Sequence, residues 1–218
     1  MKLHGVYLSP YAVINMIHLQ SKGVEYDLIF PSGGLGSEEF GKVNYMQRIP
    51  VLELGDGTKI YESAVISEFI EDGQPGRSLL GSSDLNAANI RLLARLAELY
   101  LLNAFLPVVG ELKDGHKNSR LTQHCLKVTL RGLGDVEETM KRAGYRFNAD
   151  ITLADCVLVP ALTVLSHMMP RMRDDDYLKD HPHLSAYWDD VQKNEFTAGF
   201  ISKARQAYKL RATTGEAM

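Results

Sequence analysis

The residues best suited to chemistry in this sequence lie between Asn44 and Ser63, where turns pass into strands and a helix. Pro50 precedes an apolar strand pattern, and a proline at a strand's first residue cannot donate to the ladder, which predicts an edge left open for pairing. Glu62-Ser63 opens a helix, and a serine cap presents unpaired N–H groups at the positive end of the helix dipole. A ligand with a peptide-like middle and a carboxylate end could use both features.

The helix expected to begin at Ser63 has no internal carboxylate to neutralise its start. A capping box places Glu or Gln three residues after the cap, and that position is Ile66. After Thr152, by contrast, the third position is Asp155, which can close the box. We therefore interpret the pair of Thr152 and Asp155 as structural, and the helix start at Ser63 as free to receive an external carboxylate.

The elements that must position these residues follow the order β-α-β-α-β-β-α over residues 1–73. Strand patterns cover residues 3–8, 25–30, 51–54 and 59–61, and Ser9-Pro10 begins the first helix with a favoured cap and a favoured first residue. A strand, helix and strand of this length are typical of a parallel crossover, and the last two strands form a hairpin around Asp56-Gly57. Residues 74–83 have the composition of a linker, and residues 84–218 are expected to be all-helical.

Two stretches of the helical part are unusually apolar. A helix is predicted from residue 84 through Leu106, where Pro107 kinks or ends it. Apolar residues surround almost its whole circumference, which predicts burial on several sides, part of it in a subunit interface. Residues 151–169 contain Asp155 and Pro160 among apolar neighbours, so we interpret them as a buried core helix and not a membrane span.

Composition excludes several classes of function. A formal net charge of −3 gives no electrostatic basis for binding nucleic acid or an anionic membrane. Cys125 and Cys156 form no CxxC motif, so neither a redox dithiol nor a zinc knuckle is indicated. A disulfide between them stays open, but this cysteine content favours a reducing compartment. The histidines are scattered, so no metal is expected, and the N-terminus lacks a signal core, which predicts a cytoplasmic protein.

The sequence resembles the cytosolic glutathione transferase family over nearly its whole length. The resemblance rests on motifs in the family's order and spacing: Ser9-Pro10, Lys42-Val43-Asn44, Arg48-Ile49-Pro50-Val51, Glu62-Ser63, residues 150–155 and residues 181–188. It implies a thioredoxin-like, glutathione-binding domain over residues 1–73, an all-helical domain over residues 84–218 and a homodimer. Ser9 makes the chain similar to the serine-type classes, phi, theta and their bacterial relatives.

The resemblance also implies a role for individual residues at the sulfur of glutathione. Ser9 would stabilise the thiolate of glutathione as a hydroxyl donor at a helix N-terminus. The pKa of a free thiol is about 8.5, and lowering it by about two units takes about 2.7 kcal/mol. A hydrogen bond from a hydroxyl together with a helix N-terminus can supply that amount. The alternative is that Ser9 is only a helix cap, and Tyr7 and Tyr11 are rival hydroxyls.

For the rest of glutathione, the resemblance implies that Pro50 is cis and that the backbone of Ile49 pairs with the cysteinyl unit. Glu62 would bind the γ-glutamyl ammonium and Ser63 its carboxylate. Arg48 and Lys42 would meet the glycine carboxylate, with solvated surface charge as the alternative, especially for Lys42.

The electrophile pocket is expected between the domains, with Tyr11, Tyr100 and Asn103 as its lining by resemblance. Packing between helices is the alternative for Tyr100 and Asn103. The chain departs from the family at two places: Gln47 stands where glycine is usual, and residues 13–15 replace the usual basic residue of the first helix.

The function expected is attack by the glutathione thiolate on a small hydrophobic electrophile. Dehalogenation, ether cleavage, peroxide reduction and isomerisation use the same thiolate and stay open. A non-catalytic binding module is a further alternative, against which Arg48, Glu62 and Ser63 argue, because a pure scaffold has no need of a matched glutathione site.

Overall fold

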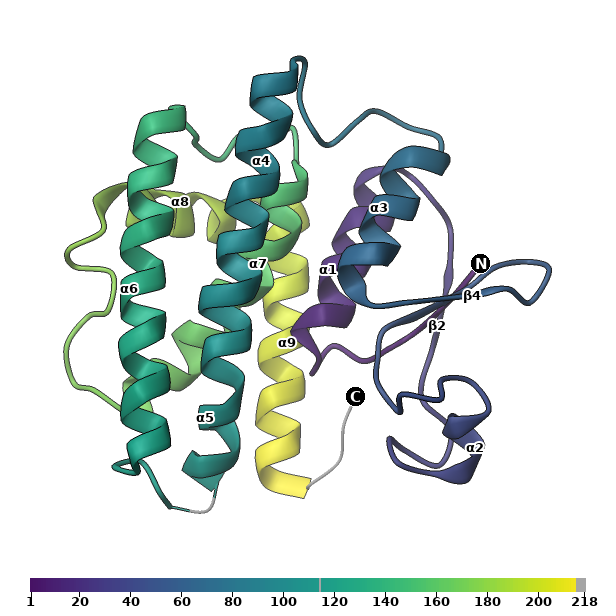
Figure 1. Ribbon diagram of the computed structural model, residues 1–218, viewed down its shortest axis with the longest axis horizontal. Helices are drawn as coiled ribbons and strands as arrows, with labels where there is room; N and C mark the ends of the chain where they lie inside the picture. The colour runs from purple at the N-terminus through teal and green to yellow at the C-terminus, as the bar shows by residue number, and fades with distance from the viewer. Residues whose placement is uncertain (114, 215–218) are drawn as a thin grey trace. The chain divides into compact units, whose positions relative to one another are not determined.

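In a computed structural model, which describes residues 1–113 and 115–214, the chain forms two units (Figure 1). The first comprises residues 1–79 together with the chain from Ser202 onward, and the second comprises residues 80–201. The division falls inside the stretch 74–83 that has the composition of a linker.

The first unit is a mixed sheet with helices. Its elements are β1 (Lys2–His4), α1 (Pro10–Ser21), β2 (Asp27–Ile29), α2 (Glu38–Gly41), β3 (Val51–Glu53), β4 (Lys59–Tyr61) and α3 (Ser63–Gly73). The sheet is four-stranded in the order β2-β1-β3-β4. Leu3 of β1 lies opposite Leu28 in a parallel pair and opposite Leu52 in an antiparallel pair. This is the thioredoxin-like arrangement, and it confirms the predicted order of elements and the parallel crossover.

One prediction about this sheet was wrong. Pro50 was expected to begin a strand with an open edge, but β3 lies between β1 and β4 and pairs with both. Leu52 therefore has Leu3 on one side and Ile60 on the other. The open backbone instead belongs to the residues before β3, because Pro50 precedes the strand and does not form part of its ladder.

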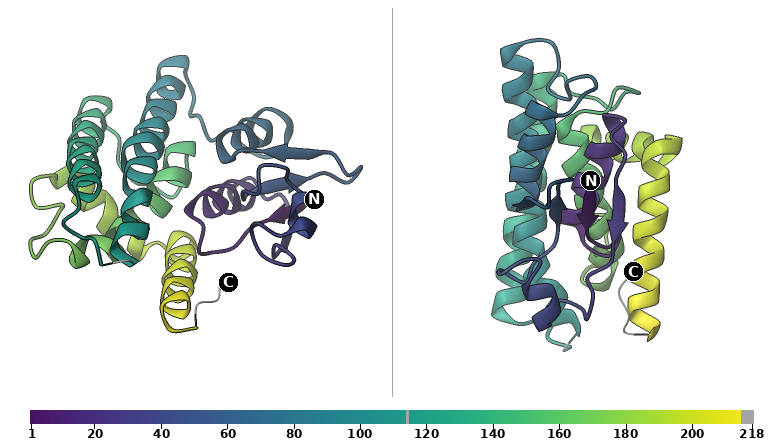
Figure 2. Two further views of the ribbon diagram at one scale, coloured as in Figure 1. Left: turned by 60° about the horizontal axis from the view of Figure 1, so that its bottom comes forward. Right: turned by 90° about the vertical axis from the view of Figure 1, so that its right-hand side faces the viewer.

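The second unit is helical. Its elements are α4 (Asp84–Leu96), the π-helical η1 (Ala97–Leu102), α5 (Asn103–Lys113), α6 (Arg120–Ala143), α7 (Leu153–Met168), the 3-10 helix η2 (Met169–Arg171) and α8 (Pro182–Lys193); α9 (Glu195–Thr214) begins here and continues into the first unit. Helix α7 contacts α4, η1 and α8 (Figures 1 and 2). Nearly all of its side chains are buried. Its stretch Leu153–Arg171 is apolar and long enough to cross a membrane, but 83% of its most apolar window is buried, which confirms a core helix.

The helix predicted to kink or end at Pro107 does not end there, because α5 continues to Lys113; the kink stays a prediction. The π-helical segment Ala97–Leu102 precedes α5, and the backbone N–H of Asn103 bonds the carbonyl of Glu98, five residues earlier. A proline ring in a helix clashes with the carbonyl four residues before it, which here is that of Asn103. The π-helical segment ends one residue before Asn103, and the helix continues past the proline ring.

Helices α1 and α3 lie side by side (Figure 1). They share a row of buried polar contacts, which we call the α1–α3 polar seam: Asn15 and His18 on α1 and Lys22 at its C-cap, with Ser63, Ser67 and Glu71 on α3. Asn15 Nδ2 donates to the carbonyl of Ser63 at 3.0 Å and to Ser67 Oγ at 2.9 Å. His18 Nε2 lies 3.4 Å from Glu71 Oε2. Residue numbers rise together along both helices, so α1 and α3 run parallel.

At the C-terminal end of the seam, polar groups surround the carboxylate of Glu71. Lys22 Nζ lies 3.5 Å from Glu71 Oε2, and the hydroxyl of Ser78 donates to Glu71 Oε1 at 2.6 Å. Burial alone would raise the pKa of Glu71, but the bonds from Ser78 and the Leu79 N–H, with the charge of Lys22, outweigh it and lower the pKa. The same burial lowers the pKa of His18 to about 4, against a smaller opposing effect of Glu71. His18 is therefore neutral at pH 7, and Lys22 and Glu71 form the charged pair.

We predict that this seam makes the fold acid-labile. In the unfolded chain His18 takes up a proton below its ordinary pKa of 6.5, whereas in the folded chain its pKa is about 4. The contribution of neutral His18 to the free energy of unfolding is therefore fully present above pH 6.5 and is lost as the pH falls toward 4. Between neutral pH and about pH 5 the free energy of unfolding should fall by about 2 kcal/mol from this residue. Urea unfolding followed by circular dichroism should show that fall, and His18→Gln should remove it.

The exposed His124 on α6 supplies the control for this prediction. His124→Gln should keep the wild-type dependence on pH. An equal slope in the wild type and in His18→Gln would contradict the role assigned to His18.

Candidate active site

Ser9 is the N-cap of α1, as predicted. Its backbone is extended, Pro10 follows as the first helical residue, and Ser9 Oγ accepts the N–H of Ala12 at 3.4 Å. No acidic residue stands in the first turn of α1. The hydroxyl uses a lone pair in this bond and keeps its proton, so it can donate to an anion placed at the helix end.

The loop before β3 is held by a buried asparagine. Asn44 Nδ2 donates to the carbonyl of Arg48 at 2.7 Å, and its Oδ1 accepts the N–H of Met46 at 2.9 Å. The bond between Ile49 and Pro50 is cis, as the resemblance implied. In the part of the chain that the structure describes, neither the backbone of Ile49 nor the exposed guanidinium of Arg48 has a hydrogen-bond partner.

Gln47 takes over the place of the family's usual glycine in two ways. Its φ is +58°, in the left-handed region that glycine adopts readily. Its side-chain amide donates to the carbonyl of Ser37 at 3.0 Å and accepts the N–H of Gly36 at 3.1 Å. The amide lies against Gly41, where a Cβ would come within 2.8 Å of Nε2. The glutamine thus fastens the glycine-rich loop, residues 31–36, to the loop before β3.

The start of α3 differs from the prediction. Glu62 is the N-cap, with φ +67°, and Ser63 is the first helical residue, so Ser63 does not cap the helix. The helix starts one residue earlier than predicted because the carbonyl of Glu62, the residue with positive φ, already accepts the Ile66 N–H. No side chain caps this end, and no acidic residue occupies its first turn. The helix start therefore remains open to an external carboxylate, as the missing capping box indicated.

The parallel seam gives these two helix starts a common direction. Asn15 bonds the carbonyl of Ser63 directly, so the first turn of α3 lies beside the middle of α1. The N-terminal ends of both helices, one at Ser9 and one at Ser63, point to the same end of the first unit. Each carries the partial positive charge of a helix dipole, and together they can hold two anionic groups of one ligand.

The other predicted residues lie in different places. Lys42 is exposed at the end of α2, 3.9 Å from Glu38 in a surface ion pair. Tyr11 is half-buried in the first turn of α1, and the hydroxyl of Tyr7 accepts from Lys203 Nζ at 3.2 Å. Tyr100 belongs to the second unit, where its backbone packs on Gly132 so closely that a Cβ there would lie 2.6 Å from the Tyr100 Cβ. Asn103 is also in the second unit, exposed at the start of α5.

Asn15 is the main residue that the sequence reasoning missed. It stands in a run of apolar residues on α1, at a place that the family usually gives to a basic residue, and it was noted there only as a departure. The sequence signal that could have identified it is an asparagine among apolar residues of a helix expected to be buried, because a buried amide side chain needs hydrogen-bond partners. Those partners are Ser63 and Ser67, so Asn15 positions the start of α3.

The pair of Thr152 and Asp155 is structural, as interpreted. The two residues form a capping box at the start of α7. Asp155 also accepts the hydroxyls of Tyr145 at 2.8 Å and Tyr187 at 2.9 Å. Burial raises the pKa of Asp155, and burial also raises the pKa values of both tyrosines. Cys125 and Cys156 are both buried and are not joined in a disulfide. No cluster of three or more metal-ligating side chains occurs in the described ranges.

Known proteins place this fold and its motifs in one family. Residues 3–78 match the family Glutathione S-transferase, N-terminal domain, and residues 96–195 match Glutathione S-transferase, C-terminal domain. The two matches follow each other in the family's order and cover most of the chain, which therefore belongs to the cytosolic glutathione transferase family.

Relatives and solved structures agree with this assignment. A glutathione S-transferase of Pseudomonas putida is 26% identical over 187 residues, which make up 85% of this chain and 84% of that protein. A maleylacetoacetate isomerase of Pseudomonas aeruginosa is 29% identical over 170 residues, 74% of this chain and 80% of that protein. The crystal structure of a glutathione S-transferase from Methylobacillus flagellatus with glutathione bound has the same fold, with a TM-score of 0.77, 23% identity, and coverage of 91% of this chain and 98% of that chain.

We predict that Gln47 controls the order of the glycine-rich loop. In Gln47→Ala the bond to the Gly36 N–H is lost, so hydrogen exchange at that amide should speed up by about fivefold or more, as expected for a bond worth about 1 kcal/mol. The amide of Thr58, which bonds Asp56 Oδ1 in the hairpin turn, is the internal control and should keep its rate. Unchanged exchange at Gly36 would show that the loop is held by other contacts.

Proposed function

We propose that this protein is a glutathione transferase that activates the glutathione thiolate for attack on a small hydrophobic electrophile. The observation that carries the proposal is the pair of parallel helix starts at Ser9 and Ser63, neither with an acidic residue in its first turn. In the same unit lies the backbone of Ile49, which has no hydrogen-bond partner among the described residues. Glutathione offers a thiolate, a peptide unit and a γ-glutamyl carboxylate, which are the groups that these three features can bind. A ligand carrier or an assembly domain has no use for such a set.

Each predicted site residue has a role in this proposal. Ser63 and the first N–H groups of α3 bind the γ-glutamyl carboxylate, and Glu62 binds its ammonium. The backbone of Ile49, next to Pro50, bonds the cysteinyl unit. Arg48 meets the glycine carboxylate, since its guanidinium is exposed and without a partner in the described residues. Lys42 contributes less, because it is exposed and already faces Glu38.

Ser9 acts at the sulfur. Its hydroxyl donates a hydrogen bond to the thiolate and does not take up the proton of the thiol. The N-terminal end of α1 adds the field of the helix dipole. A pKa lowered by about two units corresponds to about 2.7 kcal/mol, within reach of these two effects. Tyr7 stays a rival, because its hydroxyl accepts from Lys203 and, like that of Ser9, keeps its own proton to donate. Tyr11, Tyr100 and Asn103 remain the proposed lining for the electrophile.

A glutathione-dependent isomerase is the second candidate. Relatives named maleylacetoacetate isomerase include the bacterial protein at 29% identity and one from Mus musculus at 28% identity. In such a reaction the thiolate adds to a cis double bond, the new single bond rotates, and elimination returns the trans isomer and free glutathione. This relationship favours a class near the zeta transferases, and the phi or theta class stays a prediction. A cis-unsaturated dioxo acid separates the candidates, because only conjugation consumes glutathione.

We also propose a homodimer built on α4. Its leucines Leu85, Leu92 and Leu99 (the last one in η1) recur every seventh residue, so they share one face, and they are 71%, 47% and 37% exposed. A row of large apolar side chains on one face marks an interaction surface. The predicted subunit interface thus has a specific candidate. Membership of the cytosolic family favours a cytoplasmic location, which stays a prediction.

Replacement of Ser9 by alanine should lower kcat/KM for conjugation by about 10-fold, because the thiol pKa of bound glutathione rises by about one unit when the hydroxyl is lost and the helix end remains. The ultraviolet absorbance of the bound thiolate, followed against pH, should report the same shift. Ser83→Ala is the matched control, since Ser83 is also an N-cap serine and accepts the Asn86 N–H at 3.3 Å. If the thiolate still forms in Ser9→Ala, Ser9 is only a cap.

Replacement of Leu92 by glutamate should convert the dimer to a monomer in sedimentation velocity, because a charge placed in the apolar face must be desolvated on association. Leu121 on α6 is also 47% exposed, so Leu121→Glu is the control and should leave the dimer intact. A wild-type chain that sediments as a monomer would contradict the interface, and so would equal effects of the two variants.

A further inference from the structure

Positive charge is concentrated in one short stretch of the second unit. Between Gly115 and Gly134 the chain has four lysine or arginine residues and no aspartate or glutamate, although acidic residues outnumber basic ones over the whole chain. The stretch covers the turn before α6 and the N-terminal half of that helix. The formal net charge of −3, which predicts no attraction to an anionic surface, therefore conceals a local excess of positive charge.

Basic side chains share one face of α6, which we call the basic stripe: Arg120, His124, Lys127 and Arg131. The intervals of four, three and four residues keep these side chains on one side of a helix with 3.6 residues per turn. All of them are exposed. They lie opposite the face of α6 that contains the buried Thr129 and Val136, so the stripe points away from the core of the second unit.

No carboxylate in the described part of the chain pairs with these charges. Neither the members of the basic stripe nor Lys117, which is exposed in the turn before α6, have an ion pair or a side-chain hydrogen bond there. The next acidic residue along the helix is Asp135, one turn beyond Arg131, where the stripe ends. The positive charge of the stripe is therefore available to an external anion.

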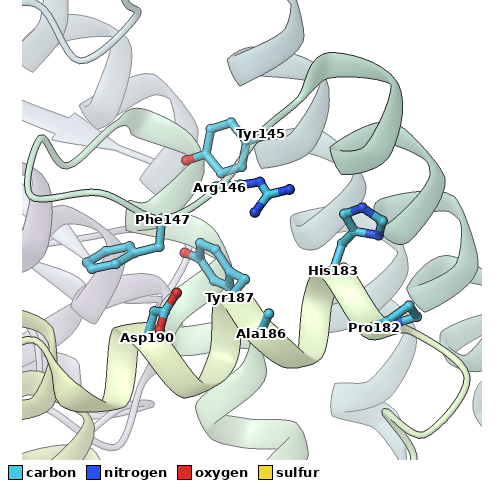
Figure 3. Close-up of a pocket in the computed structure, with 8 residues that line it drawn as sticks. All are labelled: Tyr145, Arg146, Phe147, Pro182, His183, Ala186, Tyr187 and Asp190. Carbon is cyan, nitrogen blue, oxygen red and sulfur yellow. The ribbon is translucent and has the colours of Figure 1, made fainter.

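Basic residues farther along the chain are placed differently. Arg142 Nε lies 2.7 Å from Glu138 Oε1, so its charge is offset on the same helix. Figure 3 shows Arg146 beside Tyr145 and His183, where it lines a pocket between the segment after α6 and α8. Neither arginine extends the stripe.

The stability of α6 does not account for the position of the stripe. The N-terminal end of an α-helix carries partial positive charge, so acidic residues are favourable there and cations are not. Helix α6 has no acidic residue in its first turn and begins with Arg120, whereas Lys141 and Arg142 in its last turn follow the favourable pattern. Like charges at helical spacing also repel one another. The basic residues at the start of α6 thus cost stability in the isolated chain.

The side chains around the stripe favour a lipid surface over a nucleic acid. Single-stranded nucleic acids bind by stacking bases on aromatic side chains, and residues 115–134 contain no phenylalanine, tyrosine or tryptophan. Leu121 is 47% exposed and lies three residues before His124, so an apolar side chain borders the stripe. Basic residues on one face of a helix, beside an exposed leucine, are typical of helices that lie on anionic membranes.

We propose that the N-terminal half of α6 docks on a membrane surface that contains anionic lipids. Lys117 and the basic stripe pair with the lipid headgroups, and Leu121 enters the headgroup region. Each lysine or arginine near such a surface strengthens binding by about fivefold, so the attachment is reversible and depends on salt. The docking surface is separate from the candidate glutathione site, so it stands or falls independently of the proposed transferase activity.

Sedimentation of the full chain with lipid vesicles tests the proposal. One set of vesicles contains phosphatidylcholine alone, and in the other about one third of the lipid is phosphatidylserine. At low salt the partition coefficient should be at least about tenfold higher for the anionic vesicles, and high salt should remove the difference.

A pair of double variants assigns the binding to the stripe. Arg120→Gln with Lys127→Gln should lower the partition coefficient on anionic vesicles by about tenfold or more. Arg142→Gln with Lys193→Gln removes the same charge from exposed residues that are paired with Glu138 and Asp190, and should change it far less. Circular dichroism of both variants, compared with the wild type, establishes that each one is folded.

Three results would overturn the proposal. One is equal partitioning of the wild type onto the two kinds of vesicle. Another is an equal loss of binding in the two double variants, which reduces the effect to the net charge of the chain. The third is tighter binding, per phosphate and at the same salt, of single-stranded polyuridylate than of the anionic vesicles, which makes the surface a nucleic-acid site.

Discussion

The α1–α3 polar seam is the interaction on which the candidate glutathione site depends. It joins two parallel helices through buried polar side chains, whose directional hydrogen bonds specify one register between the helices. A purely apolar interface would not specify that register as strictly. Asn15 bonds a backbone carbonyl in the first turn of α3 and a serine one turn later. These two bonds fix where α3 starts relative to α1, and so they fix the separation of two helix dipoles that point the same way.

The seam also limits the conditions under which the site exists. A neutral histidine and a lysine–glutamate pair share a space from which water is excluded, and each of them costs free energy to bury. Gly76 allows this packing, because a Cβ there would lie 2.5 Å from the carbonyl of Lys22.

The loops of the site are also stabilised by polar side chains. Gln47 and Glu62 both take left-handed conformations, and Gln47 is held by hydrogen bonds of its own side chain.

The sequence was sufficient for the order of elements and the class of fold, because the strand patterns, the serine cap at Ser9 and the hairpin turn are local signals. It was also sufficient for the open end of α3, since a missing capping box is visible in the chain. It failed where the answer depended on distant segments. The central place of β3 follows from pairing with β1, and no motif signals that the helix continues past Pro107 after a π-helical segment. Asn15 acts across 48 residues, so its role emerges only once α1 and α3 are packed.

The central claim is that two parallel helix ends and the backbone at Ile49 form one glutathione site. A titration of the isotope-labelled chain with glutathione, followed by amide chemical shifts in nuclear magnetic resonance spectra, tests it most directly. The account predicts large shifts at the amides of Ile49, Ser63 and the first turn of α1. With cysteinylglycine, which lacks the γ-glutamyl group, the shift at Ser63 should vanish while that at Ile49 remains. Saturable binding of glutathione that moves none of these amides, or the same shift at Ser63 with both ligands, would contradict it.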